Sequence, residues 1–179
     1  MSHHATIPGK MVQGLFKRVL APDLTPELIT QLAAVGIDLS VPPPPSYPRS
    51  AWYQAIALTA KALFPDQPEP AQLRKFGGHI IQSLQTRDII KSTWLTMARF
   101  AGPRRALKQA MDFTDRSPVK LTINELSKTE FEIGVDDKEQ PDFLAGVLEA
   151  AVTMLGGKSA AVSLKGPQGE SNLFRATWK

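Results

Sequence analysis

The chain has 179 residues, no cysteine and a formal net charge of +4 at pH 7. This is the length of one ordinary domain, and without cysteine there can be no disulfide, thiolate catalysis or cysteine-ligated metal centre. Hydrophobic residues make up 42% of the chain and charged residues 21%, a balance that is typical of a globular domain and excludes overall disorder. No apolar run is long enough for a membrane-spanning helix or a signal-peptide core, so we expect a cytoplasmic protein.

The first part of the chain predicts a tail, two helices and a proline-rich segment. Residues 1–10 lack hydrophobic periodicity and predict a flexible tail ahead of a single domain over residues 11–179. Thr25 and Pro26 are a typical cap and first residue of a helix, because the missing N–H of proline has no role there. Residues 42–45 are four prolines. They favour an extended segment, which could be a ligand for a proline-reading domain but which we expect to be a stiff connector.

Three more helices are predicted before residue 115, because apolar residues recur there at helical spacing. Gly77 and Gly78 interrupt the second of these helices, and each costs about 1 kcal/mol relative to alanine. The pair therefore predicts either a close helix crossing or a kink. Gly102 and Pro103 break the third helix, and Pro103 begins a short further one. The apolar stripes are Trp52, Ile56, Ala60 and Leu63; Leu73, Phe76, Ile80, Ile81 and Leu84; and Ile89, Ile90, Trp94, Met97 and Phe100.

After residue 115 the hydrophobic period changes to that of a strand. Alternating apolar residues predict strands over about 119–123, 131–135, 161–164 and 173–178, with a helix that begins at Pro141 between the two pairs. This β-β-α-β-β order follows a run of helices. It indicates an α+β fold in which an N-terminal helical layer packs on a four-stranded antiparallel sheet.

The junction of helices and sheet is where we expect a small-molecule pocket, since pockets form between packed elements. Its predicted lining takes apolar residues from the helices and from one face of the sheet. These residues could equally be core. They are Trp52, Ile80, Trp94, Phe131 and Phe174.

The positive charge is local. Residues 1–115 hold 13 Lys and Arg against 8 Asp and Glu, whereas residues 116–179 hold 8 against 9. Such a local excess can bind an acidic protein or a nucleic acid, or it can be a solvated helix face. No nucleic-acid-binding signature accompanies it, so a nucleic acid ranks last among the partners. The six basic residues concerned are Arg87, Lys91, Arg99, Arg104, Arg105 and Lys108, beside one acid, Asp88.

The sequence contains no recognisable catalytic or phosphate-binding motif. His79 is the only histidine beyond the first four residues, and without a second histidine nearby it is better explained as a boundary residue than as a haem ligand or general base. The acids of residues 136–142 lack the calcium-loop pattern and suit the start of the following helix. We therefore expect no metal, no cofactor and no enzymatic activity.

Four segments of the chain carry a resemblance to a known family. They are VQGLFKRVL, YPRSAWYQAIALTAKALFP, GPRRALKQAMDFTDR and PDFLAGVLEAAVTMLGG…LFRATW. Over residues 11–179 the chain thereby resembles the myxobacterial paralogous family of proteins of unknown function. The C-terminal part has a helix, residues 143–149, between two hairpins, and ends in Phe174-x-x-x-Trp178.

The C-terminal pattern is similar to the haem-nitric-oxide/oxygen-binding domain, the 4-vinyl-reductase small-molecule-binding domain and the TRAPP-subunit fold. This resemblance implies a helical layer over a four-stranded antiparallel sheet, frequent dimerisation and an apolar ligand cavity in several members. The haem-binding branch uses a proximal histidine and a Tyr-x-Ser-x-Arg clamp, but this chain has no tyrosine after Tyr53. The 4-vinyl-reductase type often carries C-terminal cysteines, which are also absent. Haem is therefore not expected.

These observations favour a non-enzymatic regulatory domain that binds a small apolar ligand, a protein partner or both. The alternative is an assembly module that acts only through a homodimer interface and the basic segment. Fold resemblance alone does not decide between these functions.

Overall fold

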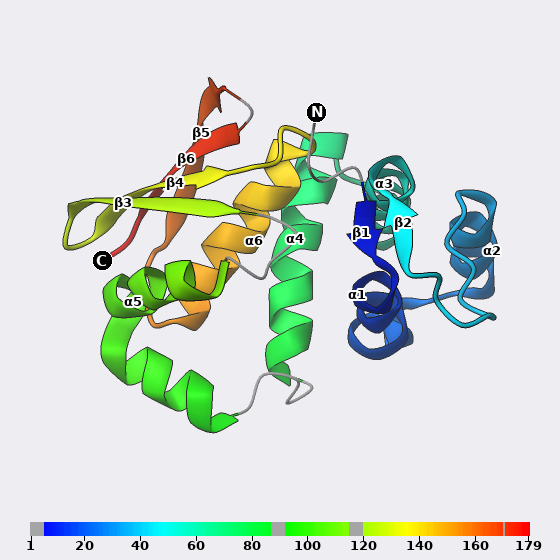
Figure 1. The fold of residues 1–179 in the computed structure, drawn as a ribbon, viewed down its shortest axis with the longest axis horizontal. Helices are drawn as coiled ribbons and strands as arrows, with labels where there is room; N and C mark the ends of the chain where they lie inside the picture. Colours follow the sequence, from blue (N-terminus) through cyan, green and yellow to red (C-terminus); the bar gives the residue numbers. More distant parts are fainter. Residues whose placement is uncertain (1–5, 87–91, 115–119, 170) are drawn as a thin grey trace.

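The computed structural model describes residues 6–86, 92–114, 120–169 and 171–179, and within residues 92–114 it leaves out the side chains of 92–95, 97 and 109–114. The fold is α+β, as predicted, and is arranged in layers (Figure 1). The sheet lies on α6 (Pro141–Met154), and α4 (Glu69–Thr86) packs on α6. The N-terminal helices lie on the far side of α4.

The N-terminal part corrects the predicted tail. Strand β1 (Thr6–Pro8) pairs with β2 (Ser46–Pro48), and Ile7, opposite Tyr47, is only 2% exposed. Helix α1 (Gly9–Gly14) begins directly after β1 and continues into a π-helical turn, Leu15–Val19. The flexible tail therefore does not reach residue 10, because a three-residue strand that pairs across 40 positions leaves no periodic signal. Residues 1–5 lie outside the described residues.

The rest of the N-terminal part follows the predicted helix signals. A short 3-10 turn, Ala21–Asp23, precedes α2 (Pro26–Ala34), and the Thr25 hydroxyl accepts the backbone N–H of Leu28 at 3.2 Å. The proline run connects α2 to β2, and the Gly9 N–H donates to the Pro45 carbonyl at 3.0 Å. Helix α3 (Arg49–Leu63) then leads into α4.

The predicted close crossing exists, and it is between α4 and α6. A Cβ added to Gly77 would lie 2.3 Å from the Phe143 carbonyl oxygen, and one added to Gly146 would lie 1.9 Å from that of Arg74. Both distances are far below van der Waals contact, so each helix needs a glycine where its partner's backbone passes. The two glycines thus fix how closely α4 approaches α6.

The sheet is antiparallel in the order β3-β4-β6-β5, built from β3 (Leu121–Ser127), β4 (Glu130–Val135), β5 (Ala161–Gln168) and β6 (Ser171–Thr177). Alternate residues of the central strands are buried, as the period-2 pattern predicts. Phe131 stacks on Trp178 with ring centroids 5.4 Å apart. The edge strands are β3 and β5.

Helix α5 (Ser92–Thr114) is broken where the sequence predicted, since Gly102 has φ 76° and Pro103 follows it. The first half of α5 lies near the end of α6, and the second half lies beside β3 (Figure 1). No helix among the described residues has the length and apolar character to cross a membrane.

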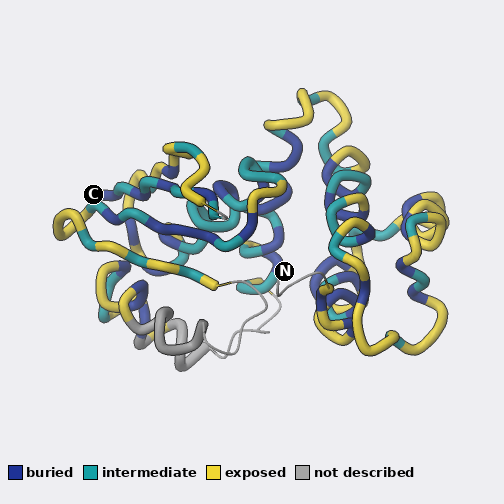
Figure 2. Tube along the Cα trace, turned by 45° about the horizontal axis from the view of Figure 1, so that its top comes forward, coloured by how far each residue is buried: buried dark blue, intermediate teal, exposed yellow. Residues whose placement is uncertain are grey.

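Buried residues form two main clusters, which Figure 2 shows as separate dark-blue regions. One cluster joins the N-terminal helices to α4, and the other lies between the sheet and α6. Leu144 of α6 packs against both clusters. The pair of helices α4 and α6 therefore forms the interface between the two clusters.

Candidate functional site

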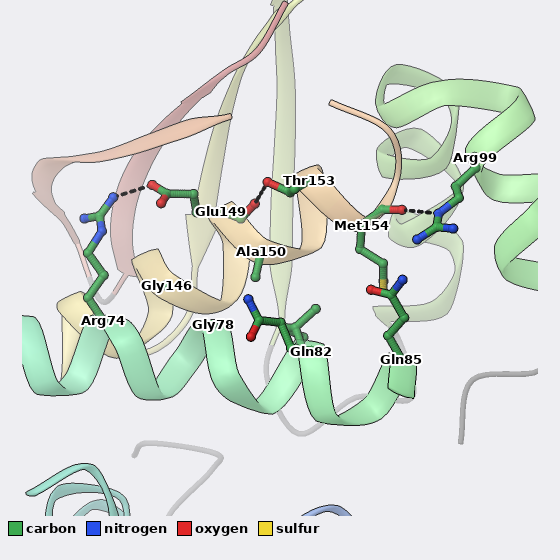
Figure 3. A pocket seen from close by; sticks show the side chains of 11 residues that line it. Arg74, Gly78, Gln82, Gln85, Arg99, Gly146, Glu149, Ala150, Thr153 and Met154 are labelled. Carbon is green, nitrogen blue, oxygen red and sulfur yellow. Dashed lines mark hydrogen bonds and ion pairs between the residues drawn. The ribbon is translucent and has the colours of Figure 1, made fainter. Parts of the chain in front are cut away.

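A groove of about 460 Å³ follows the seam between α4 and α6, and one end of it meets α5. We call it the α4–α6 groove. Figure 3 shows Gln82 and Gln85 pointing from α4 toward α6, and Arg99 of α5 at the far end. Its volume lies within the range of small-molecule pockets, about 300–1,000 Å³. Its lining residues are Arg74, Gly78, Ile81, Gln82, Gln85, Arg99, Gly146, Glu149, Ala150, Thr153 and Met154.

The glycine crossing creates this groove. At Gly77 and Gly146 the helices touch through their backbones, whereas a Cβ added to Gly78 would lie 3.9 Å from that of Ala150, in ordinary contact. The space therefore opens along the helices from the crossing toward their C-terminal ends. There the side chains of Gln82 and Gln85 from α4 face the last turn of α6 (Figure 3).

An ion pair closes the end of the groove near the crossing. The Nη2 atom of Arg74 lies 2.6 Å from Glu149 Oε2 and donates to the carbonyl of Val162 at 2.6 Å. Glu149 Oε2 also accepts the N–H of Val162 at 3.2 Å. Val162 belongs to the edge strand β5, so these two side chains satisfy backbone groups that an edge strand leaves unpaired. They are therefore already occupied and contribute no net charge.

Arg99 closes the other end of the groove. Its Nε atom donates to the carbonyl of Met154, the last residue of α6, at 2.9 Å. Carbonyls at a helix C-terminus lack intrahelical partners and carry partial negative charge, so an arginine is well placed there. Nε is the only Arg99 atom with a hydrogen bond among the described residues, which leaves its two terminal nitrogens available toward the groove. Arg99 thus supplies the one unneutralised charge of the lining.

The free polar groups of the groove are two carboxamides, which both donate and accept hydrogen bonds, and one guanidinium, which only donates. Gln82 and Gln85 contribute amides, and Arg99 contributes a guanidinium. The Thr153 hydroxyl is used within α6, since it donates to the carbonyl of Glu149 at 2.9 Å. Ile81, Ala150 and Met154 add apolar surface, and the guanidinium favours a ligand that also carries an acceptor oxygen.

A second polar cluster joins α3 to the loop before α6. The Tyr53 hydroxyl donates to Asp137 Oδ1 at 2.7 Å, and the Asn172 side chain donates to the Asp137 carbonyl at 2.9 Å. Burial, and then the hydrogen bond to Asp137, raise the pKa of Tyr53 well above its ordinary value. The Nε and Nη2 atoms of Arg49 are buried there without a hydrogen bond. This cluster ties the N-terminal helices to the C-terminal part.

The predicted pocket residues do not converge. Trp52 and Ile80 belong to the N-terminal cluster, and Phe131 and Phe174 lie fully buried in the sheet cluster. None of these four lines the α4–α6 groove. The side chain of Trp94 lies outside the described residues. Large apolar residues fill the cores here, whereas the groove combines small, polar and a few apolar residues. Of its lining, Gly78, Ile81 and Arg99 stood out in the sequence, but for other reasons than a pocket.

Two of the six predicted basic residues pair with one acid far along the chain. Arg104 Nε lies 2.7 Å from Glu125 of β3, and the Lys108 ammonium contacts the same carboxylate. First Lys108 and then Arg104 lower the pKa of Glu125 below its ordinary value. Arg105 is exposed and has no ion pair among the described residues, and Arg87 and Lys91 lie outside them. The prediction missed Glu125 because the pairing is set by how α5 packs on β3.

His79 also has a partner that spacing could not reveal, since its Nε2 lies 2.9 Å from Asp23 Oδ2. Within the described residues no group of three His, Cys, Asp or Glu side chains could hold a metal ion.

The chain matches a protein family over nearly its whole length. A family model described as "Protein of unknown function (DUF2378)" matches residues 5–179. The chain belongs to this family. No curated protein matches it.

Solved structures show a shared fold at low identity. The chain is similar to an oxygen-binding H-NOX domain related to soluble guanylate cyclases, with a TM-score of 0.64, 14% identity and coverage of 97% of this chain and 95% of that one. It is also similar to a structure from a study of H-NOX activation, with a TM-score of 0.66, 14% identity and 97% coverage of both chains. A mutant Fe(II) unliganded H-NOX protein from K. algicida has a TM-score of 0.63, 10% identity and the same coverage. The DUF2378 chain therefore has an H-NOX-like fold.

The residues of the α4–α6 groove do not fit a haem. Haem iron is ligated by His, Cys or Tyr, or by Met together with His. The groove contains Met154 but no residue of the other three types. His79, the only histidine in the described part of the chain, bonds to Asp23 and does not line the groove.

Proposed function

We propose that this DUF2378 protein is a non-enzymatic regulatory domain that binds a small polar ligand, other than haem, in the α4–α6 groove. The observation that carries the proposal is the groove itself, with two amides and a guanidinium facing one open space between the helices. The H-NOX-like fold supports it, because the solved neighbours include an oxygen-binding domain. Because Gln82, Gln85 and Arg99 line the groove, we propose a polar ligand instead of the apolar one that we predicted from the sequence.

Arg99 could couple ligand binding in the groove to the position of α5. A ligand with a carboxylate or phosphate would compete with the Met154 carbonyl for the guanidinium, because charge-assisted hydrogen bonds are the stronger ones. Arg99 lies on the first half of α5, which ends at the break at Gly102. Ligand binding would therefore change how α5 sits against α6.

The next residue, Phe100, is 89% exposed although sequence periodicity predicted that it would be buried. Phe100 is the most exposed large apolar side chain in the described part of the chain, so it is the contact residue that we choose for the proposed dimer. We place the homodimer contact on this face of α5, so that a movement of α5 changes self-association. The dimer, the myxobacterial origin and the cytoplasmic location stay predictions from the resemblance and the sequence.

Native mass spectrometry of the protein as purified tests the ligand proposal. We expect a retained mass above that of the chain, and we expect Gly78→Leu to lose it because the new side chain fills the groove. The matched control is Gly14→Leu, at a helical glycine that also has open space around it. Retention of the same mass by Gly78→Leu would contradict the proposal, as would the absence of any retained mass.

The same spectra report the oligomeric state. We expect a dimer that Phe100→Ser converts to a monomer, while Ile29→Ser, at another exposed apolar residue on α2, leaves it intact. A dimer that survives Phe100→Ser would place the interface elsewhere.

A further inference from the structure

The proline run between α2 and β2 is held in an extended form. Residues 41–44 each precede a proline, which confines them to extended ψ values, and each proline fixes its own φ near −65°. Residues 42–44 accordingly form no helix, turn or strand. Residues 41–45 are therefore a short polyproline II helix, which lies on the opposite side of the molecule from the sheet (Figure 1).

Both ends of this helix are anchored through backbone carbonyls. The amide of the buried Gln13 donates to the Val41 carbonyl at 3.0 Å, and the Gly9 N–H donates to the Pro45 carbonyl at 3.0 Å. Strand β2 begins directly after it and pairs with β1. Because the segment is already ordered, a partner that binds it loses little further conformational entropy.

Only one edge of the polyproline II helix faces the protein. Such a helix has three residues per turn, so residues three apart share an edge. Val41 shares one edge with Pro44, and Pro42 shares the next with Pro45. All four are exposed. The middle residue, Pro43, occupies the third edge and is half-buried against the first residue of α1, where an added Cβ would lie 3.3 Å from that of Pro43.

This arrangement fits a known mode of peptide recognition. Proline-reading domains such as SH3, WW and EVH1 dock a preformed polyproline II segment with the spacing PxxP into a groove lined by aromatic rings. Pro42 and Pro45 have this spacing and share an exposed edge. A plain connector needs the stiffness of the run but not two exposed edges with the third turned inward.

We propose that residues 41–45 are a docking segment for a protein domain with an aromatic-lined, proline-reading groove. None of these five side chains is ionisable, so burial of proline rings and of Val41 drives the contact. The segment shares no residue with the α4–α6 groove or with the dimer face at Phe100. The docking proposal is therefore independent of the proposed function.

Titration of ¹⁵N-labelled SH3, WW and EVH1 domains with the unlabelled full chain, followed by nuclear magnetic resonance, tests this proposal. We expect at least one of these domains to show saturable shifts confined to its aromatic groove. Pro42→Ala and Pro45→Ala, made separately, should each weaken that binding about tenfold, because two methylene groups leave the contact. Both positions are exposed, so both variants should keep the fold, as circular dichroism would show.

The matched control is Pro43→Ala, which removes the same two methylene groups from the edge that faces α1 and should leave the affinity unchanged. Pro68→Ala, at an exposed proline outside the run, should also leave it unchanged. If Pro43→Ala weakened binding as much as Pro42→Ala, the assigned edges would be wrong. Binding that survives both Pro42→Ala and Pro45→Ala, or no binding through the aromatic groove by any of the three classes of domain, would overturn the proposal.

Discussion

Replacing Gly146 by alanine should destabilise the fold, because it pushes apart the two helices that form the groove. The new Cβ would lie 1.9 Å from the Arg74 carbonyl oxygen and 2.8 Å from its carbon. Both atoms are backbone, so no side chain can rotate away. Relief requires α4 and α6 to separate by more than an ångström at their crossing, and overpacking of this kind costs about 1–3 kcal/mol or more.

The gain in helix propensity opposes this cost but is smaller. Alanine is favoured over glycine in a helix by about 1 kcal/mol, so we expect Gly146→Ala to lower the free energy of unfolding by about 2 kcal/mol. That is a large share of the roughly 5–15 kcal/mol that holds a domain together. For a chain of this size it corresponds to a fall in Tm of about 4–8 °C.

Gly78→Ala is the matched control, since it also adds one methyl group to the helix pair. Its Cβ would lie 3.9 Å from that of Ala150, in ordinary contact, so it should raise stability by up to about 1 kcal/mol. Urea unfolding measures both variants, and the slope m should stay constant if only stability changes. If Gly146→Ala proved as stable as Gly78→Ala, the close crossing described above would be wrong.

Three further predictions concern charged and hydrogen-bonded groups. The pKa of Glu125 is lowered in the folded state from an ordinary 4.5, so the stability difference between the parent and Glu125→Gln should be complete at neutral pH and shrink as the pH falls below about 4.5, as acid-dependent unfolding would show. The pKa of Tyr53 is raised from an ordinary 10.0, so the stability that its neutral hydroxyl contributes is complete below pH 10 and is lost as the pH rises above it. Tyr53→Phe should cost about 1–3 kcal/mol because Asp137 loses a donor. This difference from the parent should shrink in alkaline unfolding experiments. Glu149→Ala should speed hydrogen exchange of the Val162 amide, which donates to that carboxylate, while amides of the central strands stay protected; an unchanged rate would show that water replaces the carboxylate at no cost.

The sequence predicted those parts of the fold that depend on local patterns. Thr25 with Pro26, the break at Gly102 and the alternation along β6 each follow from rules that act over a few residues. The Gly77-Gly78 pair even indicated the close crossing, since glycine in a helix needs a reason. The partner glycine at position 146 could not be inferred, because nothing local says which helix arrives there.

Local patterns could not predict the candidate site either, because they do not show which distant segments come together. A groove forms where side chains are small or turned away, and Gly78 and Ala150 line it because their side chains are too small to fill it. The partners of charged residues were equally hidden: Glu125 is 21 positions from Arg104, and Glu149 is 75 from Arg74. Phe131 and Phe174 gave a strong sequence signal and proved to be core.

The most direct measurement of the central claim is a crystal structure of the protein purified with its retained ligand. The account predicts electron density for a small molecule between Gln82 and Gln85 of α4 and the last turn of α6, with the Arg99 guanidinium turned from the Met154 carbonyl to that molecule. A groove that holds only water while the Arg99–Met154 hydrogen bond stays intact, or a ligand bound elsewhere in the molecule, would contradict it.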